Sequence, residues 1–153
     1  MRLALTILSA ATAAAASCPS EDWQQLFDMC YWKSTFTMPW TSVATTCGSL
    51  YSGATPVMRV DFTINSFLSD RVMEGRQGWI GLCCDGECPS AGIPTDFSWL
   101  DGSPLEWELW ETQTAFHGNG SRCAYINSAG FGQWNALVES DTSYPVLCQI
   151  SAV

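Results

Sequence analysis

The sequence has few basic residues. Six lysines and arginines stand against fifteen aspartates and glutamates, which gives a formal net charge of −9. An acidic excess of this size argues against nucleic acid or an anionic membrane as the partner, because both carry negative charge. The acids are scattered along the chain and form no acidic tail, so we interpret them as a solvated surface. The sequence also contains no internal repeat, low-complexity tract or interdomain linker.

Long apolar runs are missing once the N-terminus is passed. The chain begins MRLALTILSAATAAAAS, in which Arg2 precedes an apolar run over residues 3–11 and small residues follow. This order predicts a signal peptide over residues 1–17. No later stretch approaches the ~18 uninterrupted apolar residues of a membrane-spanning helix, so we expect no membrane insertion. The sequence therefore predicts a secreted, extracellular domain over residues 18–153, a length that fits one domain.

Histidine is nearly absent, which bears on catalysis. The single histidine, His117, lies in a polar loop beside the N-glycosylation sequon Asn119-Gly120-Ser121. As a general base it would have to act with Ser121 or a nearby acid, and a histidine in such a loop is far more often a surface residue. We therefore predict that the protein is not an enzyme and that Asn119 carries a glycan.

Cysteine, by contrast, is abundant. All eight cysteines follow the predicted cleavage point, and an even number in a secreted chain predicts up to four disulfides. The stretch CCDGEC together with His117 offers zinc ligands as an alternative, but an oxidising compartment favours disulfides. The predicted disulfide cysteines are Cys18, Cys30, Cys47, Cys83, Cys84, Cys88, Cys123 and Cys148.

Two stretches have the apolar spacing of helices. In residues 39–48 the apolar positions stand at i, i+3, i+4 and i+7, and Gly48 is placed to end the helix. Residues 61–72 repeat a helical spacing, and Asp61 can cap the start. The apolar stripe predicted for the first helix consists of Trp40, Val43, Ala44 and Cys47.

Four short stretches predict strands. GWIGLCC is typical of a buried strand, and CAYI, GQWNALV and YPVLCQI predict three more. Residues 85–119 are rich in Gly, Pro, Asp and Trp and have little periodicity, so we predict a long ordered loop, which is uncommon unless functional. The fold class is therefore α+β, with two helices followed by short antiparallel strands.

The order of these landmarks resembles the C-type lectin-like domain family. FSWLDGSPLEWELW is similar to the family's Trp-x-Asp-Gly-x-x-Leu-x-Tyr-x-x-Trp run. The resemblance covers nearly the whole predicted mature chain and implies a C-type lectin-like fold, with two helices, short antiparallel β-sheets, a long irregular loop and disulfide staples. The matching residues are Cys18, Trp23, Cys30, Tyr31, Trp40, Ala44, Cys47, Trp79, Ile80, Gly81, Leu82, Trp99, Asp101, Gly102, Leu105, Trp107, Trp110, Cys123, Trp134 and Cys148.

The resemblance also implies two disulfides. Cys47 of the first helix is expected to pair with Cys148 of the last strand, which joins the two ends of the domain. Cys18 is expected to pair with Cys30 and to clip an N-terminal hairpin.

The remaining cysteines depart from the family pattern. In the family, Cys123 pairs with a cysteine further along the chain, but residues 137–147 contain none. Cys83, Cys84 and Cys88 are the remaining partners, and three connectivities stay open. We favour Cys123 bonded to Cys83 or Cys84, because the strands that carry them are expected to lie close together.

A domain with an irregular middle third has few ladder hydrogen bonds there. It needs large aromatic anchors and covalent staples to offset the chain entropy. We expect Trp79, Trp99, Trp107 and Trp110 to pack in the core beneath the loop rather than to stack on a sugar.

The family's sugar-binding members hold a calcium ion at three marked segments: a Glu-Pro-Asn or Gln-Pro-Asp triplet, an acid before the strand cysteine, and a Trp-Asn-Asp triplet. Here the matching segments read QTA, SR and WNA, so the matched positions carry no carboxylate, and Arg122 adds positive charge. Calcium needs carboxylates to offset its dehydration, so we expect no cofactor. A weak, relocated site would have to use Glu106, Glu108 or Glu111. The candidate ligand-binding residues are Glu111, Gln113, His117, Ser121 and Asn135.

These observations favour a secreted binding module that recognises a glycan or an extracellular protein ligand through the long-loop face, without calcium. Asn135 is then a remnant ligand position that bonds the backbone or contacts the ligand. The alternative is a calcium-dependent carbohydrate-binding lectin with an altered site. The sequence predicts neither the ligand nor the oligomeric state.

Overall fold

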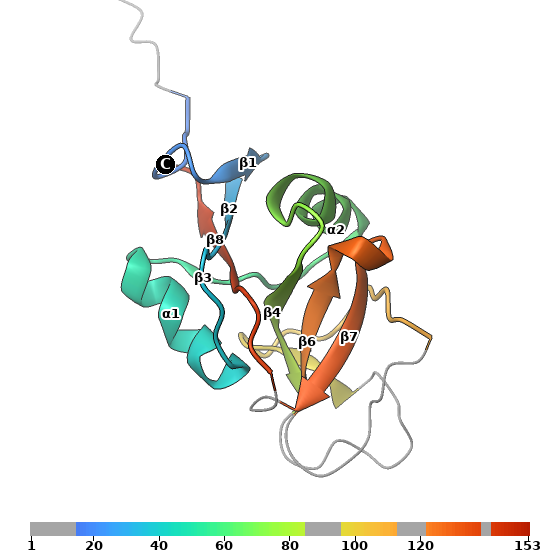
Figure 1. Cartoon of the computed structure of the whole chain (residues 1–153). Coiled ribbons are helices and arrows are strands. Elements are labelled where there is room, and N and C mark those ends of the chain that lie inside the picture. The colour runs from blue at the N-terminus through green and yellow to red at the C-terminus, as the bar shows by residue number, and fades with distance from the viewer. Residues whose placement is uncertain (1–14, 85–95, 113–121, 139–141) are drawn as a thin grey trace, which may run out of the picture.

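The structure is a computed structural model that describes residues 15–84, 96–112, 122–138 and 142–153. It contains two four-stranded antiparallel sheets and two helices, in the order that Figure 1 traces from blue to red. The predicted α+β class and the predicted C-type lectin-like arrangement of two helices with short antiparallel sheets are confirmed. None of the described helices is long and apolar enough to cross a membrane.

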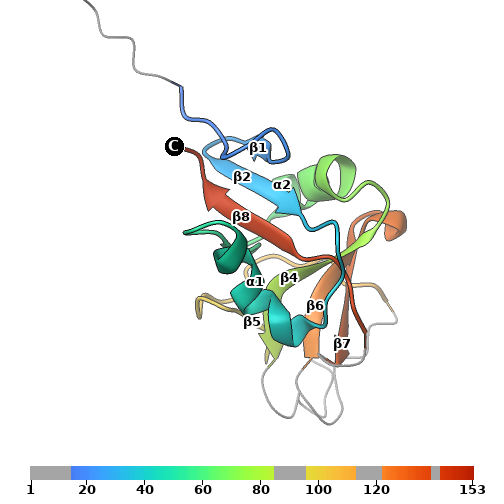
Figure 2. The ribbon, with the colours of Figure 1, turned by 60° about the vertical axis from the view of Figure 1, so that its left-hand side comes forward.

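The first sheet joins the two ends of the chain. Its strand order is β1 (Gln24–Leu26), β2 (Met29–Lys33), β8 (Leu147–Ser151) and β3 (Thr55–Pro56). The strands β2 and β8 run antiparallel over five residue pairs and lie side by side in Figure 2. Beyond them, the backbone N–H of Ser17 donates to the carbonyl of Val153 at 2.9 Å, and the reverse bond measures 3.1 Å. The second strand of the N-terminal hairpin, β2, is therefore paired to β8 along its whole length.

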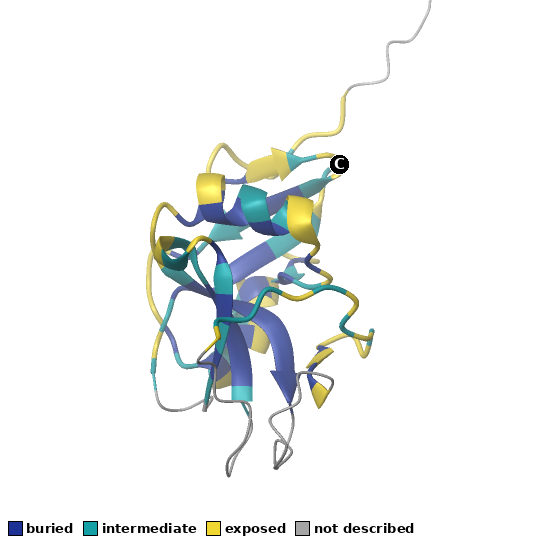
Figure 3. Cartoon of the chain, turned by 90° about the vertical axis from the view of Figure 1, so that its right-hand side faces the viewer, coloured by how far each residue is buried: buried dark blue, intermediate teal, exposed yellow. Residues whose placement is uncertain are grey.

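The second sheet forms the centre of the domain. Its order is β5 (Ser98–Trp99), β4 (Gln77–Cys84), β6 (Arg122–Asn127) and β7 (Gln133–Val138). Seven of the eight residues of β4 and four of the six residues of β6 are buried. Figure 3 shows these central strands mostly in the dark blue of buried residues. A strand with no exposed face reads as a continuous apolar run, which is why GWIGLCC predicted β4 correctly.

The first predicted helix differs from its prediction in three respects. A 3₁₀ turn, η1 (Trp40–Ser42), leads into α1 (Val43–Leu50), and the helix continues past Gly48. Ala44, predicted on the buried stripe, is exposed. Trp40, Val43 and Cys47 are buried as predicted, so the buried stripe is narrower than the predicted one by Ala44 alone. The indole N–H of Trp40 donates to the carbonyl of Ile80 at 3.2 Å, which holds this turn against β4.

The second helix begins where the sequence predicted it. The side chain of Asp61 accepts a hydrogen bond from the backbone N–H of Ile64 at 2.8 Å, so Asp61 is the N-cap of α2 (Phe62–Phe67). The helix then widens into a π-helical turn, η2 (Leu68–Val72). Its most buried polar residue is Asn65, which is 3% exposed.

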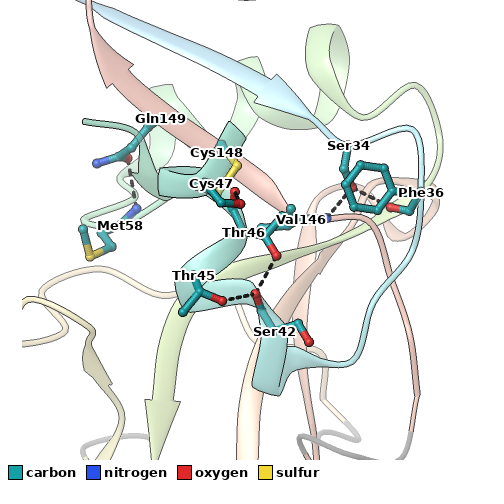
Figure 4. Close-up of a disulfide and its surroundings, with 11 residues drawn as sticks. Ser34, Phe36, Ser42, Thr45, Thr46, Cys47, Met58, Val146, Cys148 and Gln149 are labelled. Carbon is teal, nitrogen blue, oxygen red and sulfur yellow. Dashed lines mark hydrogen bonds between the residues drawn. A yellow bond between two sulfur atoms is a disulfide. The ribbon is translucent and has the colours of Figure 1, made fainter. Parts of the chain in front are cut away.

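Three disulfides lie within the described residues. Cys47 is bonded to Cys148, shown in Figure 4 between α1 and β8, and Cys18 is bonded to Cys30. Both pairings agree with the family resemblance. The chain from Cys47 to Cys148 spans 101 positions, so this bond ties the first helix to the last strand.

The third disulfide gives the partner of Cys123, which the sequence had left undecided. Cys83 is bonded to Cys123, and the two residues are direct neighbours across β4 and β6. This agrees with the preference for Cys83 or Cys84 as the partner of Cys123. Cys84 is also in a disulfide, and Cys88 lies outside the described residues.

Candidate functional site

The site is built where the irregular segment before residue 112 runs along the edge strand β7. The backbone N–H of Trp134 donates to the carbonyl of Leu109 at 2.7 Å, and the N–H of Glu111 donates to the carbonyl of Trp134 at 2.8 Å. Trp110 and Trp134 form a parallel bridge. These backbone bonds fix Glu111 beside Asn135, the next residue of β7.

The side chains of Glu111, Asn127 and Asn135 form one network, here called the amide–carboxylate network. The Glu111 Oε2 atom accepts from Asn135 Nδ2 at 2.9 Å, and Oε1 accepts from Asn127 Nδ2 at 3.0 Å. The Oδ1 atom of Asn135 accepts from the backbone N–H of Ala136 at 2.8 Å. Both carboxylate oxygens and the Asn135 carbonyl oxygen are therefore already engaged within the protein.

The amide–carboxylate network packs against Gly130, which has no side chain. A Cβ atom on Gly130 would stand 2.9 Å from Asn127 Nδ2 and 3.1 Å from Glu111 Oε1. The backbone of Gly130 therefore packs directly against both side chains. A side chain there would push the amide and the carboxylate apart.

Two of the five predicted ligand-binding residues, Glu111 and Asn135, are thus brought into direct contact. Gln113, His117 and Ser121 lie outside the described residues, as does the sequon residue Asn119.

Asn127 belongs to the network but was not predicted. Its signal in the sequence is strand periodicity. Tyr125 faces Asn135 across β6 and β7, so a side chain two residues further along β6 points to the same side.

The amide–carboxylate network lies beside a pair of tyrosines. The rings of Tyr125 and Tyr144 are 4.6 Å apart between centroids. Burial, then the neighbouring Tyr144 and the negative charge of Glu111, raise the pKa of the Tyr125 phenol well above its ordinary value. Tyr125 therefore stays neutral even at a pH at which an exposed tyrosine ionises.

Arg122 stands at the start of the same strand. Its Nε atom is buried and has no hydrogen-bond partner within the described residues. The guanidinium group of Arg122 therefore places a positive charge at the first residue of β6.

Beneath the network, Trp134 organises the aromatic core. Trp134 is fully buried, and its indole N–H donates to Asn65 Oδ1 at 2.7 Å. The Asn65 amide in turn donates to the carbonyl of Gly132 at 3.0 Å. Edge-to-face ring contacts surround Trp134, with centroid distances of 6.0 Å to Trp99, 5.4 Å to Trp107 and 5.5 Å to Trp110.

The predicted packing role holds fully for two of the four tryptophans. Trp79 and Trp99 are 0% and 3% exposed, whereas Trp107 and Trp110 are only partly buried and pack onto the core from outside. The latter two therefore have ring surface that solvent reaches.

A cavity of about 420 Å³ opens next to Trp107, between the segment before α2 and residues 99–107. Its lining consists of Arg59, Val60, Asp61, Trp99, Ser103, Pro104, Glu106 and Trp107. None of these residues belongs to the amide–carboxylate network. The cavity and the amide–carboxylate network are therefore separate, and both contain a residue that contacts Trp134 or adjoins it in the chain.

The comparison with known families follows from this geometry. The sequence model of the lectin C-type domain matches residues 36–150, which is most of the chain. The chain belongs to the C-type lectin domain family.

Two relatives carry lectin names. Lectin BRA-3 of Megabalanus rosa is 26% identical over 133 residues, which cover 86% of this chain and 78% of that protein. C-type lectin domain family 17, member A, of Homo sapiens is 30% identical over 128 residues, or 84% of this chain. The match covers 31% of that longer protein, so the C-type lectin domain corresponds to one part of it.

Solved structures repeat the fold at low identity. The carbohydrate-recognition domain of the mouse scavenger receptor C-type lectin has a TM-score of 0.70 at 21% identity, covering 89% of this chain and 98% of that one. A calcium-independent type II antifreeze protein has a TM-score of 0.72 at 22% identity, covering 93% and 100%. These two share the fold of this C-type lectin domain although their names describe different activities.

Proposed function

We propose that the protein is an extracellular carbohydrate-binding module that recognises a glycan through the long-loop face, without calcium. The family and the lectin names of its relatives support glycan binding. The three described disulfides support an oxidising, extracellular compartment, in line with the signal peptide proposed for residues 1–17 and the domain proposed for residues 18–153. Binding rather than catalysis fits a site made of amides and one carboxylate.

The proposal that binding does not need calcium rests on the hydrogen bonds of Glu111. Calcium takes six to eight oxygen ligands, several of them carboxylate oxygens. Among the described residues, Glu111 is the one carboxylate of the network, so the network offers a single anionic group, and each of its oxygens already accepts one amide hydrogen bond. No group of three His, Cys, Asp or Glu side chains in the described ranges could hold a metal ion. The described donor set does not fit a calcium ion of the kind the family uses.

The same hydrogen bonds leave groups free for a sugar. A carboxylate has about four lone-pair sites, and the network uses two of those on Glu111. Each side-chain amide has two N–H donors, and the network uses one from Asn127 and one from Asn135. Sugar hydroxyls both donate and accept, so a pair of neighbouring hydroxyls can bond to Glu111 and to an amide without an ion between them.

The test is a glycan array probed with the glycosylated, secreted protein in millimolar calcium and again in chelator. We expect the same glycans to bind under both conditions. Asn135→Ala removes one amide donor of the network, so it is expected to weaken binding by tenfold or more, which corresponds to about 1.4 kcal/mol. Glu21→Gln changes an exposed residue that is not part of the network and serves as the control.

A thermal melt in calcium and in chelator distinguishes the proposed function from the alternative, a calcium-dependent lectin with an altered site. An ion that binds only the folded state stabilises it when its concentration exceeds Kd. A melting temperature that rises in calcium, with a rise that Asn135→Ala abolishes, would establish the calcium-dependent lectin with an altered site. An empty array beside capture of an extracellular protein would replace the glycan with a protein ligand.

A further inference from the structure

The 420 Å³ cavity has the construction of a second ligand site. Ligand pockets combine a concave shape, aromatic lining and a few fixed polar groups, and they begin at about 300 Å³. This volume suits a ligand of the size of one sugar ring. The cavity meets each of the other requirements with residues outside the amide–carboxylate network.

One polar wall is fixed in place. The Nε and Nη2 atoms of Arg59 both lie 2.7 Å from Asp101 Oδ2, and the backbone N–H and hydroxyl of Ser103 donate to Asp101 Oδ1 at 2.9 and 2.6 Å. Arg59 also has φ +54°, a conformation that is costly for a residue with a long side chain. Strained backbone persists where surrounding contacts over-determine it. The guanidinium is therefore oriented before any ligand arrives, and its side chain is still 69% exposed.

The cavity is also lined by the indole ring of Trp107, which packs against two other aromatic rings. Trp107 makes edge-to-face contacts with Phe62 at 6.4 Å and with the buried Trp134 at 5.4 Å between centroids. These contacts fix the plane of the ring, and Trp107 is still only partly buried. A fixed aromatic ring presents a flat apolar surface at low entropic cost, which is what the C–H face of a sugar requires.

The charges select the kind of sugar. Arg59, Asp61 and Glu106 line the cavity, and the charge of Arg59 is already balanced by Asp101. The two remaining carboxylates make the cavity negative. An acidic sugar would meet two like charges, which disfavours its binding. The Glu106 carboxylate has no hydrogen bond within the described part of the chain and is free to accept from hydroxyls.

We propose that this cavity binds one uncharged sugar residue of a glycan, with its C–H face on Trp107 and its hydroxyls bonded to Glu106 and Arg59. The inference rests on the proposed function, glycan recognition, and adds a second contact point with a charge preference. A glycan that reaches both the cavity and the amide–carboxylate network gains from the two contacts at once.

The experiment titrates the whole domain with single methyl glycosides in chelator, observed through the tryptophan indole N–H signals. The probes are methyl β-galactoside, methyl α-mannoside, methyl N-acetyl-β-glucosaminide, methyl β-glucoside and the acidic methyl β-glucuronide. We expect at least one uncharged glycoside to shift the Trp107 signal, which a Trp107→Phe spectrum assigns. Glu106→Gln is expected to weaken that binding by fivefold or more.

Two comparisons sharpen the test. Methyl β-glucuronide is expected to bind at least tenfold more weakly than methyl β-glucoside, and Glu106→Gln is expected to narrow that gap because it removes one repelling charge. Glu21→Gln has the same charge change on an exposed residue outside the cavity and is expected to leave both affinities unchanged. Glu106 is exposed, so its substitution tests the cavity even if changes at Trp107 disturb the fold.

The failure of this inference differs from the failure of the proposed function. Glycoside binding that Asn135→Ala weakens and Glu106→Gln leaves intact would overturn the cavity site and support the amide–carboxylate network as the sole sugar contact. Equal affinity for the uncharged and acidic glycosides would overturn the charge preference. Absence of binding to every glycoside and to every array glycan would overturn the proposed function and this inference together.

Discussion

Asn65 offers the sharpest test of how the core supports the site. Its side chain accepts from the Trp134 indole N–H at 2.7 Å and donates to the Gly132 carbonyl at 3.0 Å, and Trp134 is fully buried. Asn65→Ala would leave a buried donor and a buried acceptor without partners. Each such group costs roughly 1–3 kcal/mol, so we expect a loss of about 3 kcal/mol in the free energy of unfolding.

The loss is measurable by chemical denaturation and by thermal melts. For a domain of about 150 residues, 1 kcal/mol shifts Tm by roughly 2–4 °C, so the expected decrease is about 10 °C. A double-mutant cycle with Trp134→Phe isolates the hydrogen bond, because the phenylalanine ring keeps much of the packing and lacks the N–H.

Each single substitution leaves one partner of the Asn65–Trp134 bond buried and unpaired, whereas the double substitution removes both partners of that bond. The Gly132 carbonyl loses its partner in both variants that lack Asn65, so its cost cancels in the cycle. We therefore expect the two losses to be less than additive by about 1–2 kcal/mol. Additivity within 0.5 kcal/mol would refute the reasoning, because it would mean that the bond contributes nothing to the folded state.

Three further substitutions test other parts of the fold. Replacing both Cys47 and Cys148 with alanine removes a link that spans 101 positions, so we expect denaturation to reveal a loss of roughly 4–5 kcal/mol from loop entropy. Gly78→Ala places a Cβ 2.9 Å from a buried leucine side chain and is expected to cost about 1–3 kcal/mol, whereas Gly48→Ala meets its nearest atom at 3.5 Å within a helix and should stabilise the protein slightly. Hydrogen bonds from Ser103, then Arg59, lower the pKa of Asp101, so its contribution is present above the unfolded pKa of ~3.9 and is lost as pH falls through the folded value. Asp101→Asn should therefore lower Tm at pH 7 and leave Tm less sensitive to acid than in the unmodified protein.

Elements with strong local signals were predictable from the sequence. Asp61 as the N-cap and the helix over residues 61–72 depend on contacts within a few positions, and the structure confirms both. The strand from GWIGLCC was predictable because β4 is buried on both faces. The exposed Ala44 was not, because the face that α1 buries depends on distant contacts, such as the bond of Trp40 to Ile80 and the disulfide of Cys47 to Cys148.

The partner of Cys123 shows where sequence reasoning stops. The cysteines at 83 and 84 are adjacent in the chain, and the sequence does not distinguish them. In a strand, successive side chains point to opposite faces, so a single register decides which one meets Cys123. The pairing of Cys83 with Cys123 across β4 and β6 makes that choice, and a shift between Trp79 and Cys83 contributes to it.

The site also depends on the alternation of side chains between the two faces of β7. Trp134 points into the core and bonds Asn65, while Asn135, the next residue, lies on the other face and bonds Glu111. The backbone of Trp134 meanwhile pairs with residues 109 and 111, which holds Glu111 at the height of Asn135. One dipeptide therefore links the buried hydrogen bond to the partly buried network. A weakened Asn65–Trp134 bond should loosen this strand and, with it, the spacing of the carboxylate and its amides. For this reason Asn65→Ala should reduce glycan binding as well as stability, although Asn65 belongs to the core and not to the amide–carboxylate network.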